Sequence, residues 1–239
     1  MKFALVDGGR REPEPGIVGT CPGCGEEVTP KCGTVRVWHW AHKVRMCDPW
    51  WEPETEWHRT WKNMFPVSWQ EAPMRAPNGE LHIADLRTPS GLVIEFQHSA
   101  IKPPERAARE TFYQNMLWIV DGTRLKRDLP RIDQNLAGWR RLTEGNIELS
   151  AWPGEFLPKQ WLDCPVPVLF DFNKLQPEGP EGVQQALEGQ SPSARRGMER
   201  WTAPASRPAH LICLLPNRFR NMACYFSIER ETVVKVGHG

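Results

Sequence analysis

Between residues 50 and 141, the pattern of apolar and polar positions predicts a helix, three strands, a second helix and a further strand. The first helix follows Pro53, which suits a first-turn position, and ends before Pro66, which cannot continue a helix. The strands are short runs rich in β-forming residues. In some of them apolar and polar residues alternate, and in others the apolar run is continuous. The predicted elements are a helix over Pro53–Phe65, strands over Val67–Ala72, Leu81–Arg87 and Leu92–Gln97, a helix over Pro104–Asn115 and a strand over Met116–Asp121.

This order of elements, αβββαβ, predicts an α/β fold whose last strand joins the sheet through a right-handed crossover. The first 49 residues are short strand-like runs broken by glycine and proline. Residues 176–209 are rich in proline, glycine, serine and charge, which predicts a flexible segment. Further strands are expected at Val166–Phe172, His210–Leu215 and Ala223–Ile228. The expected regions are 1–49, 50–141 and a small β-rich C-terminal region over 142–239.

The composition excludes several classes of protein. Apolar residues make up 40% and charged residues 25% of the 239 positions, as in ordinary soluble domains. No apolar stretch approaches the roughly 20 residues that span a bilayer, and Met1–Arg10 lacks the features of a signal peptide, so we expect a cytoplasmic protein without a membrane partner. Because 30 Lys and Arg residues nearly balance 29 Asp and Glu residues, binding to nucleic acid would require a local basic surface.

Two carboxylates are predicted to face each other in the hairpin of the second and third central strands. If residues 89–91 form a three-residue loop, cross-strand partners sum to 180, and Asp85 lies opposite Glu95 with Gln97 on the same face. Carboxylates this close repel unless one keeps its proton or a cation lies between them. Their oxygens suit Mg²⁺ or Mn²⁺, so the pair predicts metal-assisted phosphodiester hydrolysis. The alternative for Asp85 alone is a solvated strand residue.

The first helix is expected to add three polar side chains to this site. Glu54, His58 and Lys62 are spaced four residues apart and therefore lie along one stripe of a helix. In that arrangement Glu54 is a third or second-site metal ligand, and His58 and Lys62 contact phosphate. The alternative is a solvated charged face.

A cluster of cysteine and histidine residues near the N-terminus predicts a structural zinc site. Cys21-Pro-Gly-Cys24-Gly is a compact turn, and a closed zinc site needs four nitrogen or sulfur ligands. We expect Cys21 and Cys24 to be ligands, joined by two of His39, His42 and Cys47, with His42 favoured. The alternative is a reduced, metal-free loop. The module is either purely structural or also grips nucleic acid, with Trp38 and Trp40 stacking on bases.

Basic residues gather after the predicted hairpin. Residues 102–141 contain nine Lys and Arg residues against five acids, which suits contact with a phosphate backbone. The candidate DNA contacts are Arg106, Arg109, Arg124, Lys126 and Arg127. For the two on the second helix, the alternative is ion pairing of Glu105 with Arg109 and of Arg106 with Glu110. For the other three, it is a solvated loop.

Several of these runs resemble one known family. HWAHK, C-D-x-W-W-E-x-E-T-E-W-H-R-x-W-K, HIADL, LVIEFQHS and RETFYQNMLWIVDG are similar to the competence protein CoiA-like nuclease family, which resembles the PD-(D/E)XK nuclease superfamily with a restriction-endonuclease-like αβββαβ core. The resemblance implies that Asp85 belongs to the aspartate motif, that Glu95 and Gln97 form the second motif and that Glu54 is the first-helix acid. Gln97 stands where most of the superfamily has lysine. It would orient the attacking water, with positive charge from Lys62 or, as we favour, from the metal.

The sequence therefore predicts a Mg²⁺- or Mn²⁺-dependent deoxyribonuclease with a zinc-binding module. Its partner is DNA, and the family implies further recombination or defence proteins. The alternative is a catalytically inactive, DNA-binding recombination accessory protein, which the absence of the lysine favours and the intact Asp85–Glu95 pair opposes.

Overall fold

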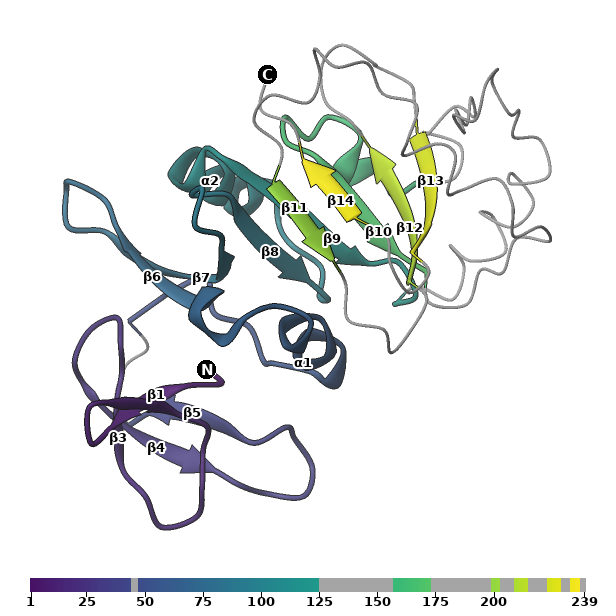
Figure 1. Cartoon of the computed structure of the whole chain (residues 1–239). Coiled ribbons are helices and arrows are strands. Elements are labelled where there is room, and N and C mark those ends of the chain that lie inside the picture. Colours follow the sequence, from purple (N-terminus) through teal and green to yellow (C-terminus); the bar gives the residue numbers. More distant parts are fainter. Residues whose placement is uncertain are drawn as a thin grey trace. The chain divides into compact units, whose positions relative to one another are not determined.

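The computed structural model of the chain describes residues 1–43, 47–124 and 157–172, together with the backbone of four further strands between residues 199 and 236. The chain divides into two compact units, Met1–Asn115 and Met116–Gly239, and each is described by itself (Figure 1). Both sheets and helices are present, so the fold is mixed α/β. Across the described residues, no helix has the length and apolar character needed to cross a membrane.

The first unit begins with a small antiparallel sheet in the strand order β2-β1-β3-β4-β5. Its core includes Met1, Val28 and Trp40, all buried. Gly19 is required where two strands approach, because a Cβ atom there would lie 2.8 Å from Cβ of Ala4. The strands are β1 (Ala4–Val6), β2 (Gly9–Arg11), β3 (Gly19–Thr20), β4 (Glu27–Lys31) and β5 (His39–His42).

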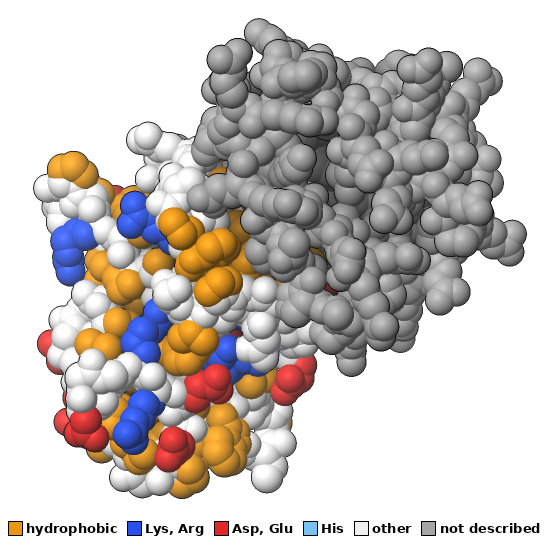
Figure 2. Space-filling model, viewed as in Figure 1, with side chains coloured by type: hydrophobic (Ala, Val, Ile, Leu, Met, Phe, Trp, Pro, Cys, Tyr) orange, Lys and Arg blue, Asp and Glu red, His pale blue; other side chains and the backbone are white. Residues whose placement is uncertain are grey.

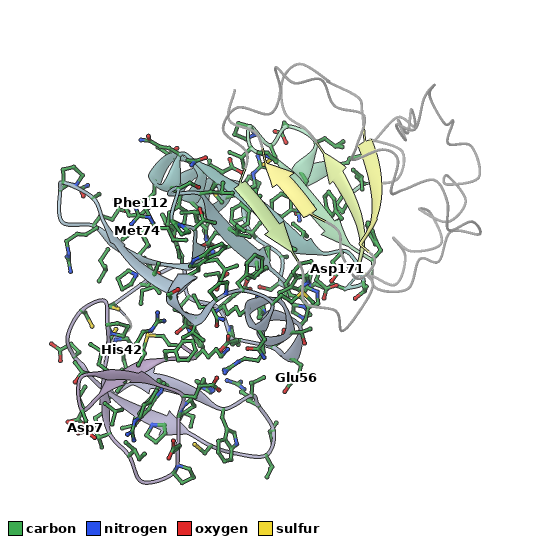
Figure 3. All side chains as sticks on the ribbon, in the orientation of Figure 1. Asp7, His42, Glu56, Met74, Phe112 and Asp171 are labelled. Atoms are coloured by element: carbon green, nitrogen blue, oxygen red, sulfur yellow. The ribbon has the colours of Figure 1, made fainter. Side chains whose placement is uncertain are left out.

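The same unit continues with two helices and an antiparallel three-stranded meander in the order β6-β7-β8. A short 3₁₀ turn, η1 (Val67–Trp69), leads into the first of these strands. Trp61 and Phe65 each pack against Phe96, with ring centroids about 6 Å apart. The side chains of the described residues are drawn in Figure 3. The elements are α1 (Glu56–Asn63), β6 (Gln70–Arg75), β7 (Leu81–Arg87), β8 (Val93–Gln97) and α2 (Pro103–Tyr113).

The predicted order of central elements is confirmed, but several of the predicted boundaries are wrong by one to three residues. The first helix begins at Glu56 and not at Pro53, because the Thr55 hydroxyl accepts a hydrogen bond from the backbone N–H of His58 while the His58 ring accepts one from the Thr55 N–H. This reciprocal capping box fixes the helix start. The strand predicted over Val67–Ala72 begins only after the 3₁₀ turn, at Gln70.

The second unit contains a mixed sheet in the order β9-β10-β12-β13 and a separate two-stranded sheet of β11 with β14. Strands β9 and β10 are parallel, with Trp118 opposite Val168, and the other pairs are antiparallel. Trp118, Trp161 and Phe170 are buried in its core. The elements are β9 (Met116–Asp121), η2 (Lys159–Trp161), β10 (Val168–Asp171), β11 (Glu199–Thr202), β12 (Ala209–Leu214), β13 (Ala223–Ile228) and β14 (Val233–Val236).

The division after Asn115 does not coincide with the predicted regions 1–49, 50–141 and 142–239, which stay predictions. The first 49 residues share a compact unit with the next elements because buried contacts join them. Glu71 on β6, for example, accepts hydrogen bonds from the backbone N–H groups of Lys2 and Phe3. Within the segment 176–209 predicted to be flexible, β11 is a strand, which corrects that prediction at Glu199–Thr202, and most of the remainder lies outside the described residues.

Candidate metal centre and acidic pocket

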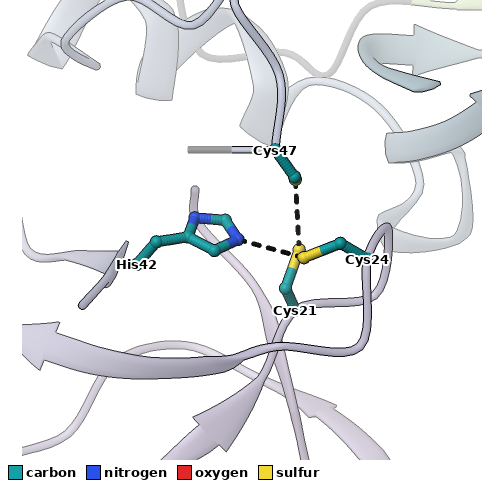
Figure 4. A group of neighbouring side chains, drawn as sticks. All are labelled: Cys21, Cys24, His42 and Cys47. Carbon is teal, nitrogen blue, oxygen red and sulfur yellow. Dashed lines mark hydrogen bonds between the residues drawn. The ribbon is translucent and has the colours of Figure 1, made fainter. Parts of the chain in front are cut away.

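Four of the five predicted zinc ligands come together in the first unit. One ligand atom from each of Cys21, Cys24, His42 and Cys47 lies within 4.8 Å of all the others (Figure 4). The Sγ atoms of Cys21 and Cys47 are 3.8 Å apart, and Sγ of Cys24 is 3.3 Å from Nε2 of His42. The structure thus selects His42 and Cys47 from the alternatives that the sequence left open.

The turn that contains Cys21 and Cys24 explains how their two sulfur atoms come together. Cys21 lies directly after β3, and its backbone carbonyl accepts a hydrogen bond from Gly25 N–H at 3.0 Å. Gly25 has a φ of 80°, a left-handed conformation that favours glycine. The N–H of Gly23 points at the Cys21 sulfur at 3.4 Å. This turn therefore presents both sulfurs to one side and offers a backbone donor to a thiolate.

The donor set fits a zinc ion. Zinc lies about 2.3 Å from sulfur in a tetrahedron, which puts two sulfur ligands roughly 3.8 Å apart, and the Cys21–Cys47 separation of 3.8 Å has that length. Burial, together with the neighbouring Cys21 thiol, raises the pKa of Cys47, and burial also raises the pKa of Cys21. A bound cation would reverse this effect, because metal binding favours the thiolate form. The Cys₃His cluster can therefore hold a metal such as zinc.

The remaining candidates of this module lie outside the cluster. Nδ1 of His39 lies 2.9 Å from the carbonyl oxygen of Val37, two residues earlier, and His39 is not a member of the cluster. Of the two tryptophans predicted to stack on bases, Trp38 is 45% exposed, whereas Trp40 is 1% exposed within the core. Burial of Trp40 corrects its predicted role, and base stacking by Trp38 stays a prediction.

The predicted facing of Asp85 and Glu95 follows from the register of their strands. Leu86 pairs with Ile94 and Arg87 with Val93, so partners sum to 180 as predicted. Next to these backbone pairs, the side chains of Asp85 and Glu95 accept hydrogen bonds from the backbone of the opposite strand. Asp85 N–H donates to Oε1 of Glu95 at 3.1 Å, and Phe96 N–H donates to Oδ2 of Asp85 at 3.0 Å. Both acids line one pocket, together with Glu54, His58 and Lys62.

A fourth carboxylate in this pocket, Glu71 on β6, was not predicted. Partners on β6 and β7 sum to 156, for example in the pair Ala72–Ala84, and this register places Glu71 opposite Asp85. Glu71 is 3% exposed and has a left-handed φ of 47°, strained for a residue with a side chain. Three acids therefore lie in one row across β6, β7 and β8.

Lys62 on α1 lies among these carboxylates. Its Nζ is 2.8 Å from Oδ1 of Asp85, 3.3 Å from Oε1 of Glu54 and 3.4 Å from Oε1 of Glu71. Burial opposes the charged ammonium, but the three carboxylates outweigh burial and raise the pKa of Lys62 well above its ordinary value. Glu54 is also paired with Arg59, at 2.8 Å. Glu54 and Lys62 therefore bind each other inside the pocket and do not form a solvated face.

Glu95 is held from the opposite side by α2. Nη1 of Arg109 lies 3.1 Å from Oε2 of Glu95. Burial and the neighbouring Asp85 carboxylate nevertheless raise the pKa of Glu95 to about 8, against the lowering effect of Arg109. Burial is the main cause, so the Glu95 carboxyl favours its protonated form beside Asp85.

Gln97 and His58 lie beside Glu52, another acid that the sequence reasoning did not select. The Gln97 amide donates to Oε1 of Glu52 at 3.1 Å and to the Ser99 carbonyl oxygen at 3.0 Å. Nε2 of His58 is 3.5 Å from the same Glu52 oxygen and makes no hydrogen bond within the described part of the chain, although His58 is only 3% exposed. Its Nδ1 is used by the Thr55 cap. The second imidazole nitrogen therefore faces the Glu52 carboxylate in the pocket.

Of the predicted DNA contacts, two form the ion pairs given as their alternative. Arg109 pairs with Glu105 at 2.6 Å and Arg106 with Glu110 at 3.1 Å, and both arginines are buried. Arg124 is exposed after β9, whereas Lys126 and Arg127 lie outside the described residues. On the face of the first unit in Figure 2, Lys and Arg side chains are interspersed with hydrophobic and acidic ones. Contact of these arginines with DNA stays a prediction.

The oxygen donors of Asp85 and Glu95 fit a hard divalent cation such as Mg²⁺ or Mn²⁺. In this structure the oxygens of Asp85 and Glu95 that backbone N–H groups do not hold face Lys62 and Arg109, so such an ion would have to replace these cations. The same holds for Glu54, whose oxygens face Lys62 and Arg59.

Comparison with protein families gives one match. Residues 20–48 match the family described as "Competence protein CoiA, N-terminal domain", and this segment contains all four members of the Cys₃His cluster. Comparison with curated proteins and with solved structures gave no match. The family match suggests a function related to competence and confirms the resemblance to the CoiA family, whereas the resemblance to the PD-(D/E)XK superfamily stays a prediction. Over residues 20–48, the chain is therefore similar to the N-terminal domain of the CoiA family.

Proposed function

We propose that the chain is a metal-dependent DNA nuclease that hydrolyses phosphodiester bonds. The observation that carries this proposal is the placing of Asp85 and Glu95, from adjacent strands, in one pocket with Lys62 and His58. Phosphodiester hydrolysis needs hard anionic ligands for a divalent ion and cationic groups near the reacting phosphate. The assignment of α1, β6–β8, α2 and β9 to a restriction-endonuclease-like core is part of the same proposal.

In this mechanism Asp85 and Glu95 hold the catalytic Mg²⁺ or Mn²⁺. When bound, such an ion polarises the phosphorus centre and lowers the pKa of a water ligand. Glu95 must lose its proton to bind the ion, and Arg109 at 3.1 Å stabilises the deprotonated carboxylate. The backbone N–H groups of Asp85 and Phe96 fix one oxygen of each acid, which orients the remaining oxygens.

Lys62 and His58 act on the phosphate. The Lys62 ammonium lies 2.8 Å from Asp85, and its raised pKa keeps it charged at neutral pH. It can therefore donate to a phosphate oxygen next to the metal ligands. The sequence favours the metal as the source of positive charge in place of the missing lysine at position 97, and the position of Lys62 supports a share for this helix residue. Nε2 of His58 offers a second contact.

DNA is proposed as the substrate because of the competence-related family match. Involvement in recombination or in defence against foreign DNA belongs to the same proposal. The described residues supply exposed cationic and aromatic side chains for DNA contact in Arg36, Trp38 and Arg124. Zinc in the Cys₃His cluster is proposed as a structural ion.

The test is nicking of supercoiled plasmid by the purified full chain, with and without added Mg²⁺ or Mn²⁺. Glu95→Gln removes the anionic ligand at nearly constant volume, and cleavage is expected to fall at least about 100-fold, a loss typical of essential catalytic groups. Glu105→Gln is the matched control, because Glu105 contacts the same arginine from α2 but does not line the pocket. Metal-independent cleavage, or full cleavage by Glu95→Gln, would refute the proposal.

A second candidate is a DNA-binding accessory protein that no longer cuts. One observation favours it: both hydrogens of the Gln97 amide are used by Glu52 and by the Ser99 carbonyl, so the amide is not free to orient water. DNA binding without metal-dependent nicking, unchanged by Glu95→Gln, would support this candidate.

A further inference from the structure

We propose that Asp48 couples metal binding at the Cys₃His cluster to the acidic pocket by fixing the backbone of β7 close to Asp85. Asp48 directly follows Cys47, a member of the cluster, and is itself buried. The inference rests on metal binding by that cluster, but it does not require the nuclease activity.

Both oxygens of Asp48 are used to hold β7 and the segment that leads to α1. Oδ2 accepts a hydrogen bond from the backbone N–H of Ile83 at 2.8 Å. Oδ1 lies 2.8 Å from Nδ1 of His82 and accepts the backbone N–H of Trp50 at 2.9 Å. One carboxylate therefore links the residue after a cluster ligand to two consecutive residues of β7.

His82 strengthens the link. It is 1% exposed, its Nε2 lies 3.0 Å from Oε1 of Glu80, and the Trp50 ring stacks on it with planes 6° apart. The segment after Cys47 thus contacts β7 in three ways: Asp48 binds the Ile83 N–H, Asp48 binds the buried His82 ring, and Trp50 stacks on that ring. Loss of Asp48 would leave a buried imidazole nitrogen and a backbone donor without this partner, which is costly inside a protein.

The hydrogen bonds of Asp48 fix β7 close to Asp85. Ile83 lies two residues before Asp85, and the Asp85 N–H is capped by Glu95, so side-chain carboxylates hold this stretch of β7. Consecutive Cα atoms are about 3.8 Å apart, so a metal ion that fixes Cys47 also restricts the position of Asp48. The same segment continues to Trp50 and Glu52, which line the pocket. A bound metal ion at the cluster is therefore expected to order one wall of the pocket.

The test is hydrogen exchange of the full-length, zinc-loaded protein, read on peptides that cover β7 at Leu81–Arg87. Asp48→Ala is expected to accelerate exchange there about tenfold or more, since it removes a buried cap. Removal of zinc from the wild-type protein is expected to accelerate the same amides, whereas removal from Asp48→Ala adds little. β9 (Met116–Asp121) should change in neither case.

Glu80→Gln is the matched control, because Glu80 contacts the other nitrogen of His82 and does not cap Ile83. In this variant, removal of zinc should still accelerate hydrogen exchange at the Ile83 amide. If Asp48→Ala does not fold, Asp48→Asn serves instead, since its amide oxygen still caps Ile83 while its NH₂ group cannot accept from Trp50 or His82. A β7 that keeps its protection when bound zinc is removed would overturn the coupling alone. A protein that binds no zinc would overturn both the coupling and the zinc site.

Discussion

The Cys₃His cluster and the acidic pocket lie in the same compact unit, yet their potential metal ligands are arranged differently. In the cluster, one sulfur or nitrogen atom of each residue lies within 4.8 Å of all the others. In the pocket, carboxylates are paired with buried cations: Asp85 with Lys62 and Glu95 with Arg109. The difference follows from charge. Buried thiols with raised pKa values are neutral and can pack together without a metal, whereas carboxylates need cations nearby.

The pocket has cations of its own, whereas a metal ion bound at the cluster would add stability directly, because metal binding is linked to folding. The largest expected effect is therefore at the cluster. Cys24→Ser should lower zinc affinity by more than the roughly 10–100-fold typical of changes around a ligand, and should lower the melting temperature, because metal binding contributes directly to folding.

Cys32→Ser is the matched control for Cys24→Ser, since Cys32 belongs to the same module but not to the cluster. Zinc content per chain and thermal unfolding are the measurements. Equal zinc content in both variants would contradict the assignment of the ligands.

The next effect is expected at Lys62. Lys62→Met removes a buried ammonium and leaves Glu54, Glu71 and Asp85 to repel one another, which should cost about 3–5 kcal/mol of unfolding free energy. Added Mn²⁺ should restore part of this stability, because an ion can then replace the ammonium among the carboxylates. Chemical denaturation with and without Mn²⁺ measures both changes.

Lys102→Met serves as the control for Lys62→Met, because Lys102 is exposed at the start of α2. If the two variants were equally stable, Lys62 would not be the cation that holds the pocket together.

A smaller effect is expected at Glu71, which ties the N-terminal strand to the pocket. Glu71→Gln keeps one acceptor for the N–H groups of Lys2 and Phe3 but turns an NH₂ group toward the other donor and toward Lys62. Loss of a charged, buried acceptor typically costs about 1–3 kcal/mol. Glu105→Gln, at a partly exposed ion pair, should cost less than about 1 kcal/mol in the same denaturation experiment. A reversed ranking would show that Glu71 is not structurally important.

Local patterns sufficed to predict part of this site. The loop at residues 89–91 determined the register that places Asp85 opposite Glu95, and the same reasoning was available for β6 and β7. The Asn78-Gly79 turn, with Gly79 at a φ of 91° and Ala76 bonded to Glu80, sets a register that places Glu71 opposite Asp85. Glu71 was missed because that second turn was not used.

Other features depend on contacts between distant parts of the chain, which no local pattern contains. His42 joins the cluster and His39 does not, because β5 pairs with β4 in a register that puts His42 opposite Val28. Arg109 points inward to Glu95 because α2 packs beside β8, although its spacing in the helix equally suited a surface contact. The Asp48 link joins residues more than thirty positions apart in the sequence.

A last expected effect is a pH dependence that originates at Glu95. The folded protein raises the pKa of this carboxyl from 4.5 to about 8, so between these values the folded state binds more protons than the unfolded state. Stability from this group is therefore complete below about pH 4.5 and declines as the pH rises toward 8, by at most about 1.4 kcal/mol per pH unit. Without divalent ions, the free energy of unfolding of Glu95→Gln should depend less on pH over this range than that of the wild-type protein. Because a bound cation favours the deprotonated carboxylate, Mn²⁺ should flatten the wild-type profile and leave that of Glu95→Gln unchanged. Identical profiles for the two proteins would mean that the folded protein does not raise the pKa of Glu95, and the contrast between the two regions would then lose its electrostatic basis.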